Sequence, residues 1–220
     1  MQLAGRDLVI FDCDGVLVDS ERISCGVLAR RLTAEGLPTT VAEARRDYQG
    51  LLLTEVGASI EAKLGRALAD NWLEEFESER SAEFRLDLEP VRGARAAVER
   101  VAAAGLAVCV ASQGKLEKTR LSLELTGLGD LFPERAVFSA WTVPRGKPHP
   151  DLFLRAASSM GVDPAACVVV EDTPSGVTAA LRAGMPALGY AGDSDEQALR
   201  DAGATVFHSL EELPAILGLP

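Results

Sequence analysis

The chain has 220 residues, a formal net charge of -11 and an isoelectric point of about 4.7. That length suits one sizeable core, or a core with a smaller insertion. An acidic chain of this kind is not expected to bind nucleic acid, because neutralising a phosphate backbone needs clustered Lys and Arg. No basic stripe occurs in the sequence.

The sequence also predicts no membrane partner and a cytoplasmic location. No segment reaches the roughly 18 to 20 apolar residues that a membrane span requires, and the N-terminus lacks a charged region followed by a long apolar stretch. The cysteines, at positions 13, 25, 109 and 167, show no C-x-x-C spacing. A reducing compartment fits this usage best.

The first expected strand is the apolar run of residues 8–11, and polar residues follow it directly. Asp12 and Asp14 are two residues apart, so in an extended backbone both side chains point into one small volume. Two carboxylates there repel, which indicates either a divalent metal or a nucleophile beside a general acid. Gly15 permits a sharp turn and a close backbone approach. Taken alone, Asp and Gly after a strand are also ordinary turn residues.

Residues 17–88 have no β-branched run and show helix-period patterns rich in Ala, Leu, Glu and Arg. One strand precedes this segment and the other strands follow it, so we expect an all-helical cap inserted after the first loop. The expected division is an α/β core of residues 1–16 and 89–220 and a cap of residues 17–88. An insertion at this place could cover the site.

Short apolar runs alternate with helical patterns in the second half of the chain. The further expected strands are residues 106–111, 136–140, 167–170, 186–190 and 204–207. Helices are expected at 93–104 and 174–183, each ended by a glycine, and a capping box at 209–212 opens a last one. This alternation predicts a doubly wound parallel sheet, a Rossmann-like α/β core whose ligands bind beyond the carboxyl ends of the strands.

Polar groups stand at two further positions in this second half. Ser112 follows the second expected strand and leads with Gln113 into a helix, where a hydroxyl and backbone N–H groups suit an anionic oxygen. A simple N-cap is the alternative for this serine. Lys147 is held just before a helix start by two prolines. Its ammonium could offset the Asp pair and bind a phosphoryl group, or it could be an exposed loop lysine.

Glu171 and Asp172 close the strand of residues 167–170, ahead of Thr173-Pro174, which is typical of an N-cap followed by proline at the first helical position. Asp172 could merely cap that helix. Four acidic groups on two strand ends would be costly without a bound cation. Mg²⁺ is the expected cofactor, because it prefers oxygen ligands and no cluster of His or Cys offers a softer site.

These segments together resemble a known family. Asp12-Cys13-Asp14-Gly15, Ser112, Lys147 and Glu171-Asp172 match, in order and strand context, the four motifs of the haloacid dehalogenase-like hydrolase superfamily. The chain resembles its capped phosphatase branch over essentially the whole length. Residues 12–21 and 171–176 are especially similar to the sugar-phosphatase and β-phosphoglucomutase-like subgroup. One departure is Val16, where many members have Thr.

The resemblance implies a phosphoric monoester hydrolase for a small phosphorylated metabolite, such as a sugar phosphate. It implies that Asp12 attacks phosphorus and forms an aspartyl-phosphate, which water then hydrolyses. Asp14 would act as acid and then as base, a role suited to a carboxyl whose pKa is raised by its neighbour. Ser112 and the Gly15 N–H would bind phosphoryl oxygens, and Lys147 would neutralise their charge.

The resemblance also implies the remaining site residues. Mg²⁺ would be held by Asp12, the Asp14 carbonyl oxygen and Asp172, with Glu171 acting through a water. The expected phosphate- and substrate-binding residues are Gly15, Ser112, Gln113, Lys147, Gln49 and Arg46. The last two come from the cap, whose wider pool of polar candidates is Arg45, Arg46, Tyr48, Gln49 and Lys63.

Two alternatives remain beside the phosphatase. A β-phosphoglucomutase-like phosphomutase would use the same core, but such members carry an Arg after the Gly in the segment resembled by residues 50–53, where this chain has Leu53. A phospho-accepting regulatory domain places its phospho-acceptor on a later strand than its acidic pair and needs no insertion. The expected partner is thus a small phosphorylated metabolite, and no motif predicts an oligomeric state.

Overall fold

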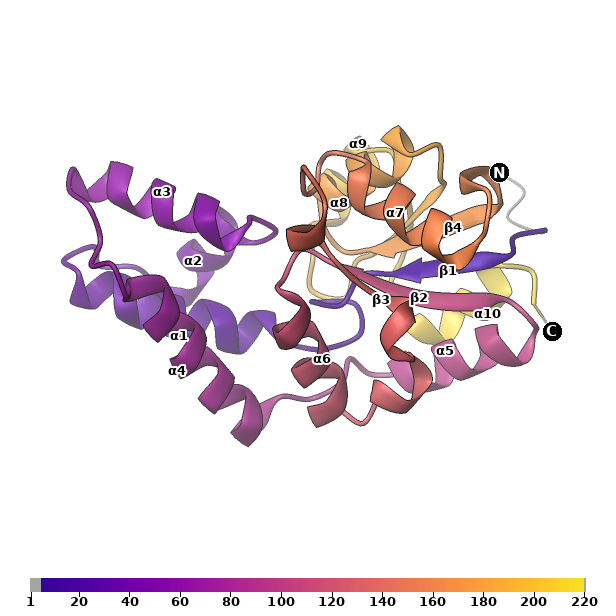
Figure 1. Cartoon of the computed structure of the whole chain (residues 1–220), viewed down its shortest axis with the longest axis horizontal. Helices are drawn as coiled ribbons and strands as arrows, with labels where there is room; N and C mark the ends of the chain where they lie inside the picture. Colours follow the sequence, from indigo (N-terminus) through magenta and orange to yellow (C-terminus); the bar gives the residue numbers. More distant parts are fainter. Residues whose placement is uncertain (1–4, 220) are drawn as a thin grey trace.

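The computed structural model describes residues 5–219, which form an α/β core and a group of four helices beside it (Figure 1). The strands are β1 (Leu8–Phe11), β2 (Ala107–Ser112), β3 (Val137–Ser139), β4 (Cys167–Glu171), β5 (Ala187–Tyr190) and β6 (Thr205–Phe207). The α-helices are α1 (Glu21–Ala34), α2 (Val41–Tyr48), α3 (Leu53–Leu64), α4 (Trp72–Asp87), α5 (Ala94–Ala103), α6 (Leu116–Leu125), α7 (Asp151–Met160), α8 (Pro174–Arg182), α9 (Glu196–Asp201) and α10 (Leu213–Ile216). Short 3₁₀ turns are η1 (Gly129–Leu131), η2 (Glu134–Ala136), η3 (Ala140–Thr142), η4 (Pro164–Ala166) and η5 (Leu210–Glu212).

All six strands are parallel and lie in the order β3-β2-β1-β4-β5-β6. They lie where the sequence predicted them, with boundaries shifted by no more than one residue. β1 is in the middle, and its last residue, Phe11, is in register with Val110 of β2 and Val170 of β4. The residues that follow β1 and β4, and the last residue of β2, therefore meet at one edge of the sheet.

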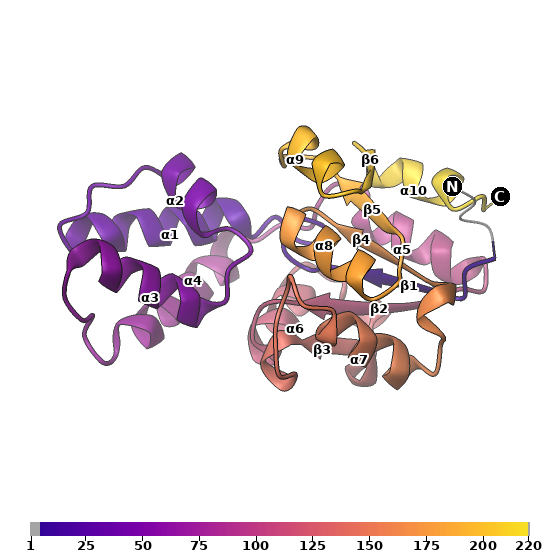
Figure 2. The same cartoon turned by 90° about the horizontal axis from the view of Figure 1, so that it is seen from above.

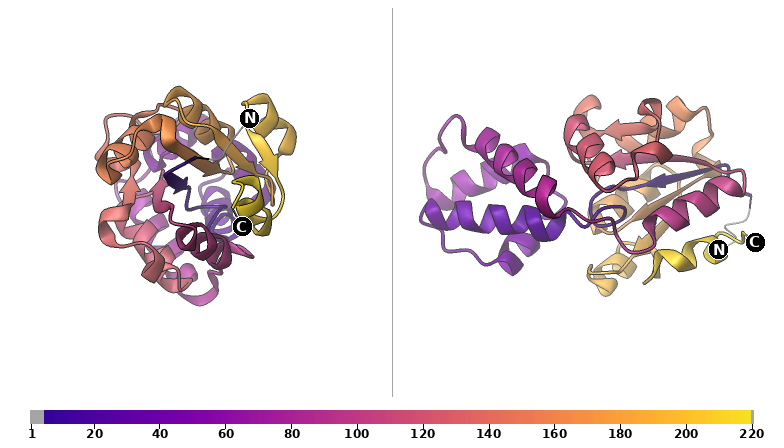
Figure 3. Two further views of the ribbon diagram at one scale, coloured as in Figure 1. Left: turned by 90° about the vertical axis from the view of Figure 1, so that its right-hand side faces the viewer. Right: turned by 90° about the horizontal axis from the view of Figure 1, so that it is seen from below.

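Helices cover both faces of the sheet. Val9 and Phe11 of β1 pack in one apolar cluster with α5 and α10, whereas Leu8 and Ile10 pack in a second cluster with α7 and α8. Figure 1 shows α7 and α8 above the sheet and α5 below it, and the end-on view in Figure 3 shows the same layers. Strands buried on both faces read as continuous apolar runs, and alternate residues face opposite layers. The predicted doubly wound, Rossmann-like α/β core is confirmed.

Helices α1 to α4 form the cap, and all of residues 21–87 that are regular are helical, as expected (Figure 2). α1 packs against α2 and α4, and aromatic side chains from α4 fill the space between them. Trp72, Phe76 and Phe84 of that helix are almost fully buried. Thr40 opens α2 with the reciprocal hydrogen bonds of a capping box to Glu43. The predicted inserted all-helical cap is confirmed.

Two short stretches of chain, residues 17–19 and 89–91, join the cap to the core. They run antiparallel and are hydrogen-bonded to each other: Asp19 N–H donates to the Glu89 carbonyl (3.0 Å), and Val91 N–H donates to the Leu17 carbonyl (2.9 Å). We call them the linker pair. The chain therefore leaves and re-enters the core at a single place beside the Asp12 to Gly15 loop.

The expected helix starts in the core are also present. Thr173 accepts from the Gly176 N–H and Pro174 is the first residue of α8. Ser209 and Glu212 form the expected capping box, which opens η5 just before α10. No helix within residues 5–219 is long and apolar enough to cross a membrane.

Candidate active site

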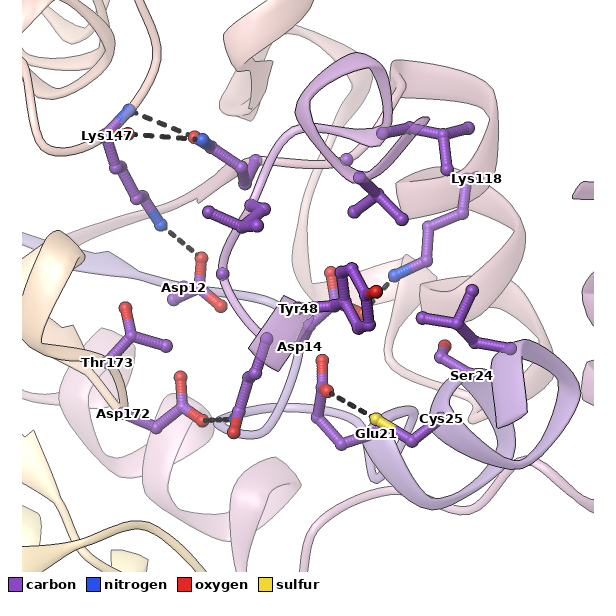
Figure 4. Close-up of a pocket in the computed structure, with 18 of the residues that line it drawn as sticks. Asp12, Asp14, Glu21, Ser24, Cys25, Tyr48, Lys118, Lys147, Asp172 and Thr173 are labelled. Carbon is purple, nitrogen blue, oxygen red and sulfur yellow. Dashed lines mark hydrogen bonds and ion pairs between the residues drawn. The ribbon is translucent and has the colours of Figure 1, made fainter. Parts of the chain in front are cut away.

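A pocket lies at the carboxyl edge of β1 and β4, where the cap meets the core (Figure 4). Its walls come from both bodies. The core supplies Asp12, Asp14, Gln113, Gly114, Lys118, Trp141, Lys147, Glu171, Asp172 and Thr173. The cap supplies Glu21, Ser24, Cys25, Leu28, Tyr48, Gln49, Gly50, Leu51, Leu53, Val56, Phe76 and Arg80. Most of the chemical groups predicted from the sequence are thus brought together in one place.

A buried lysine joins the ends of three strands. Lys147 Nζ forms ion pairs with Asp12 Oδ1 and with Glu171 Oε1 (2.5 Å), and it donates to the Ala111 carbonyl of β2 (3.1 Å). All three charged side chains are buried. Burial lowers the pKa of Lys147, but the charges of Asp12 and Glu171 outweigh it and raise the pKa above its usual value. Lys147 is therefore a fixed cation and not an exposed loop lysine.

Asp12 is the carboxylate at the end of the central strand. Its pKa is raised to about 8, chiefly by burial, and the nearby Lys147 charge lowers it only in part. The charges of Glu171 and Asp14 push it further up. A buried carboxylate that is this costly to ionise is a group that a further cation would stabilise.

Asp14 lies on the other side of the pocket floor, in a different environment. Ser20 Oγ donates to its Oδ1 (2.5 Å), Ser112 Oγ donates to its Oδ2 (3.3 Å), and Lys118 Nζ forms a close ion pair with it. Burial raises the pKa of Asp14, but the charge and hydrogen bond of Lys118 and the hydrogen bond from Ser20 outweigh it, so the pKa lies below its ordinary value. The sequence-based expectation of a raised pKa is thus reversed, because a lysine and not a carboxylate is the dominant neighbour.

Asp172 follows β4 and points into the pocket with one oxygen held and one free. Its Oδ2 accepts from Gln49 Nε2 of the cap (3.2 Å) and from Ser194 Oγ (3.2 Å). Its Oδ1 is buried and has no hydrogen-bond partner in the described part of the chain. Burial, followed by the charges of Glu171 and Asp12, raises the pKa of Asp172 well above its usual value. An unpartnered buried carboxylate oxygen of this kind is suited to a cation.

Gly15 makes a different contribution from the one expected. Its N–H, which was expected to bind phosphate, already donates to the Val18 carbonyl (2.9 Å). Its φ is +80°, and a Cβ at this position would lie 2.2 Å from Asp172 Oδ2. The glycine is therefore required by the close approach of the Asp12 to Gly15 loop to Asp172.

Glu171, which was expected to act on the metal through a water, has protein partners in this structure. Its Oε1 pairs with Lys147, and its Oε2 accepts from the N–H groups of Asp172 and Thr173 (3.1 Å each) and from Thr173 Oγ1 (2.9 Å). Within residues 5–219, no group of three or more His, Cys, Asp or Glu side chains is gathered as a metal cluster. Mg²⁺ is compatible with the oxygens of Asp12 and Asp172, whereas both oxygens of Glu171 are already engaged.

Gln113 lines the pocket, but its amide is used to hold a loop. Its Oε1 accepts from the Lys147 N–H (3.0 Å), and its Nε2 donates to the Lys147 carbonyl (3.3 Å). Ser112 is fully buried at the end of β2, with its Oγ toward Asp14. Gln113 thus holds the backbone of Lys147 in place, and Ser112 contacts Asp14.

The cap candidates divide into two groups. Gln49 and Tyr48 line the pocket, and Arg45 supports Gln49 through a hydrogen bond from its Nε to Gln49 Oε1 (3.2 Å). Arg46 does not reach the pocket: its side chain is 70% exposed and pairs with the adjacent Asp47. Arg46 thus lies on the outer face of α2, away from the pocket, and nothing in its position supports the predicted contact with substrate. Lys63 likewise lies outside, on the ring of Tyr48.

The sequence-based prediction missed Glu21, Arg80 and Lys118, which line the pocket, and Ser20, which donates to Asp14. Lys118 could have been found because lysine is rare in this chain, which has only four, at 63, 115, 118 and 147. Each of them was therefore a candidate for the site. Arg80 carries a signal of pattern. It is four residues from both Phe76 and Phe84, so a cation stands within an aromatic stripe of α4. Polar groups on an apolar helical stripe are candidates for a pocket.

The comparisons with known proteins agree with this arrangement. The 6-phosphogluconate phosphatase of Escherichia coli (strain K12) is 29% identical over 211 residues, covering 96% of this chain and 94% of that protein. Hexitol phosphatase A of the same organism is 31% identical over 220 residues, covering 93% and 91%. A HAD family hydrolase from Deinococcus radiodurans R1, solved with bound phosphate and sodium, has a TM-score of 0.78 and 32% identity, covering 97% and 96%. The profile of the haloacid dehalogenase-like hydrolases matches residues 6–184. The chain belongs to the haloacid dehalogenase-like hydrolase family.

Proposed function

We propose that the protein is a Mg²⁺-dependent phosphatase that removes the phosphoryl group from a small phosphorylated metabolite, such as a sugar or sugar-alcohol phosphate. One observation carries the proposal: Asp12, a buried carboxylate at the end of the central strand, is paired with the buried Lys147 and faces a pocket that lies between the core and the cap. The names of the two Escherichia coli relatives support a small phosphorylated sugar derivative: 6-phosphogluconate is the phosphate of a sugar acid, and a hexitol phosphate is that of a sugar alcohol.

The proposed reaction has two halves. In the first, a carboxylate oxygen of Asp12 forms a bond to phosphorus as the bond to the leaving oxygen breaks, and Asp14 gives a proton to that oxygen. In the second, Asp14 takes a proton from water, whose oxygen bonds to phosphorus as the aspartyl-phosphate bond breaks. Lys147 neutralises charge on Asp12 and on the phosphoryl oxygens in both halves. The Ser112 hydroxyl is the further candidate to bind a phosphoryl oxygen.

Asp14 must carry a proton when the leaving oxygen departs, although Lys118 holds its pKa low in the free protein. A phosphomonoester brings about two negative charges into the pocket at neutral pH. These charges compete for the Lys118 ammonium and raise the pKa of Asp14. Substrate binding itself would thus prepare the acid.

Mg²⁺, when bound, would supply positive charge that offsets the repulsion between the Asp12 carboxylate and the phosphoryl oxygens. We assign its ligands to Asp12, the Asp14 carbonyl oxygen and Asp172. The unpartnered Oδ1 of Asp172 and the raised pKa of Asp12 support this assignment, because both mark carboxylates that lack sufficient positive charge.

A direct test is hydrolysis of an aryl phosphate by the purified protein with Mg²⁺ and with excess chelator. We expect turnover only with Mg²⁺. Acid quenching during turnover should trap one phosphoryl group on the peptide that contains Asp12, and Asp12→Asn should remove both the trapped group and the activity. Full turnover in chelator would contradict the role of the metal. Retention of a substantial rate in Asp12→Asn would contradict the covalent route.

A further inference from the structure

Arg80 is a pocket-lining cation that no protein group satisfies. It projects from α4 into the pocket, and its side chain is only 14% exposed. It makes no hydrogen bond to any described residue, and its buried Nε is unpartnered. Its nearest carboxylate, Glu77, is 3.9 Å away and is already paired with Lys115 at 2.6 Å.

Aromatic rings hold this guanidinium in place. Its carbon is 5.0 Å from the ring centroid of Phe76 and 5.8 Å from that of Phe84. The two rings lie one helical turn before and after Arg80, so they fix its direction without using its N–H donors. Burying an arginine with free donors is costly unless a partner arrives. This distinguishes Arg80 from Arg22, Arg30 and Arg66 of the cap, which are exposed and paired with carboxylates.

The position of Arg80 relative to the two aspartates indicates which part of a substrate it would meet. The ring of Phe84 lies under both the Arg80 guanidinium (5.8 Å) and the Lys118 ammonium (5.5 Å), and Lys118 pairs with Asp14, which places Arg80 on the Asp14 side of the pocket. In the proposed reaction Asp12 meets phosphorus and Asp14 meets the leaving oxygen. Arg80 therefore faces the leaving group and not the transferred phosphoryl group.

We propose that Arg80 binds a carboxylate on the leaving group, so that the preferred substrate is the phosphate ester of a hydroxy acid and not of a neutral polyol. This inference rests on the proposed phosphatase function. The planar guanidinium fork matches a carboxylate with two parallel N–H···O bonds, and both its amino groups are free to make them.

The charge balance of the pocket favours a carboxylate over a second phosphate. Lys147 is used by Asp12 and Glu171, and Lys118 is used by Asp14. Arg80 has only Glu77 at 3.9 Å, so among the pocket cations of residues 5–219 it has the most distant carboxylate partner. Glu21 adds an acidic group on the same wall. One free positive charge balances a monoanion, whereas a second phosphate would bring about two negative charges beside Glu21.

The test uses matched pairs of substrates with Mg²⁺ present. The pairs are the terminal phosphates of aldonic acids with three to six carbons and those of alditols of equal length, which differ in one carboxylate. We expect the wild-type kcat/KM to favour the acid of the best chain length by about 10 to 100-fold, the value of a charge-assisted pair. Arg80→Gln should abolish that preference, and Arg80→Lys should restore part of it. The exposed Arg85 on the same helix is the matched control, and Arg85→Gln should keep the wild-type ratio.

The ratio of kcat/KM for the acid phosphate to kcat/KM for the alditol phosphate distinguishes substrate binding from a structural role. If Arg80 only supported the fold, Arg80→Gln would lower both values equally. No preference in the wild type at any length, or an unchanged preference in Arg80→Gln, would overturn the proposal. A bisphosphate of the alditol turned over better than the acid would also overturn the choice of a carboxylate.

Binding provides a measurement that does not depend on turnover. Calorimetry with the Asp12→Asn protein should show tighter binding of the phosphorylated acid than of the phosphorylated alditol, and Arg80→Gln in that background should remove the difference. If neither ester is hydrolysed by the wild type but this binding difference is present, the proposed reaction fails and the Arg80 site stands. Equal binding of both esters overturns the site.

Discussion

The core and the cap place their pocket side chains by different means. In the core, Asp12 and Glu171 stand at or just beyond the ends of the neighbouring strands β1 and β4, and the register of the sheet fixes their spacing. In the cap, Glu21 and Arg80 project from two helices. Their positions depend on how those helices pack on each other and against the core.

Few polar contacts tie the two bodies together around the pocket. Gln49 of the cap donates to Asp172 (3.2 Å), and Glu77 of α4 pairs with Lys115 of the core (2.6 Å). The groups proposed for chemistry thus sit on a hydrogen-bonded sheet, while the groups proposed for selection sit on a separate group of helices that the linker pair joins to the core. Substitutions in the core should therefore affect all substrates alike, and substitutions in the cap should act according to the leaving group.

The largest effect on the rate is expected from Asp14, the second carboxylate of the Asp12 to Gly15 loop. Asp14→Asn should lower kcat by roughly 10² to 10⁴, the range for losing general acid–base catalysis. The loss should be similar for an aryl phosphate and for a natural substrate, because Asp14 belongs to the core. Calorimetry should find Mg²⁺ affinity little changed, since only the Asp14 backbone oxygen is assigned to the metal. A collapse of that affinity would show that the two aspartates have been given the wrong roles.

The next effect concerns the metal and can be measured without turnover. Asp172→Asn should weaken Mg²⁺ binding by at least about 10 to 100-fold, the cost found even for partners outside the first ligand shell. Ser194→Ala removes one of the two hydrogen bonds to Asp172 Oδ2 and should cost less. Titration calorimetry on the free protein gives both values. Wild-type affinity in Asp172→Asn would exclude this carboxylate as a ligand.

A smaller effect separates two neighbouring residues of the cap. Gln49→Ala should lower kcat/KM for a good sugar phosphate by about 3 to 10-fold, because one neutral hydrogen bond is lost at the pocket. Arg46→Ala should change it little, since Arg46 is exposed and paired with Asp47. For an aryl phosphate at saturating Mg²⁺ both variants should resemble the wild type, although Gln49→Ala also removes one hydrogen bond to Asp172 Oδ2. Equal losses from the two substitutions would contradict the pocket assignment.

The smallest effect is on stability and depends on pH. Burial, and then the charge of Asp14, raises the pKa of Glu21. A folded-state pKa above the unfolded value means that the folded protein binds the proton more tightly, so the carboxyl costs stability as pH rises from about 4 through the folded pKa. Glu21→Gln should therefore raise the unfolding midpoint of the metal-free protein near neutral pH.

That gain should vanish below pH about 4, where Glu21 is protonated in both the folded and the unfolded state. The exposed Glu124 is the control, and Glu124→Gln should not reproduce the pH-dependent gain. A destabilised Glu21→Gln protein at neutral pH would indicate that the ionised carboxylate is needed by Arg80 or Lys118.

The sequence predicted the core well because its signals are local. Each strand is an apolar run, and the chemical groups follow directly after β1, β2 and β4. The environment of Asp14 could not be predicted, since Lys118 reaches it from α6, 104 positions along the chain. A side chain on a helix reaches the site only if the helix packs at the right angle. A local sequence pattern does not predict that packing angle.

Arg46 and Gln49 show the same limit within the cap. The two residues are three apart, but α2 ends at Tyr48 and Gln49 has an extended backbone (φ -60°, ψ 135°). The chain therefore turns Gln49 toward Asp172 and leaves Arg46 on the outer face of the helix. The residue at which α2 ends decides which of the two candidates lines the pocket, and helix ends are the least reliable part of a sequence-based prediction.

The linker pair has a consequence for how such proteins diversify. Its two stretches, residues 17–19 and 89–91, are hydrogen-bonded neighbours, so the two ends of the inserted segment lie about one strand spacing apart, roughly 5 Å. A cap of another size or sequence could be joined at the same two points without lengthening any connection in the core. The cap is in this sense an exchangeable cassette. Replacing the cap at the linker pair, by natural recombination or by grafting, would change the substrate selectivity and leave the core residues proposed for the reaction unchanged.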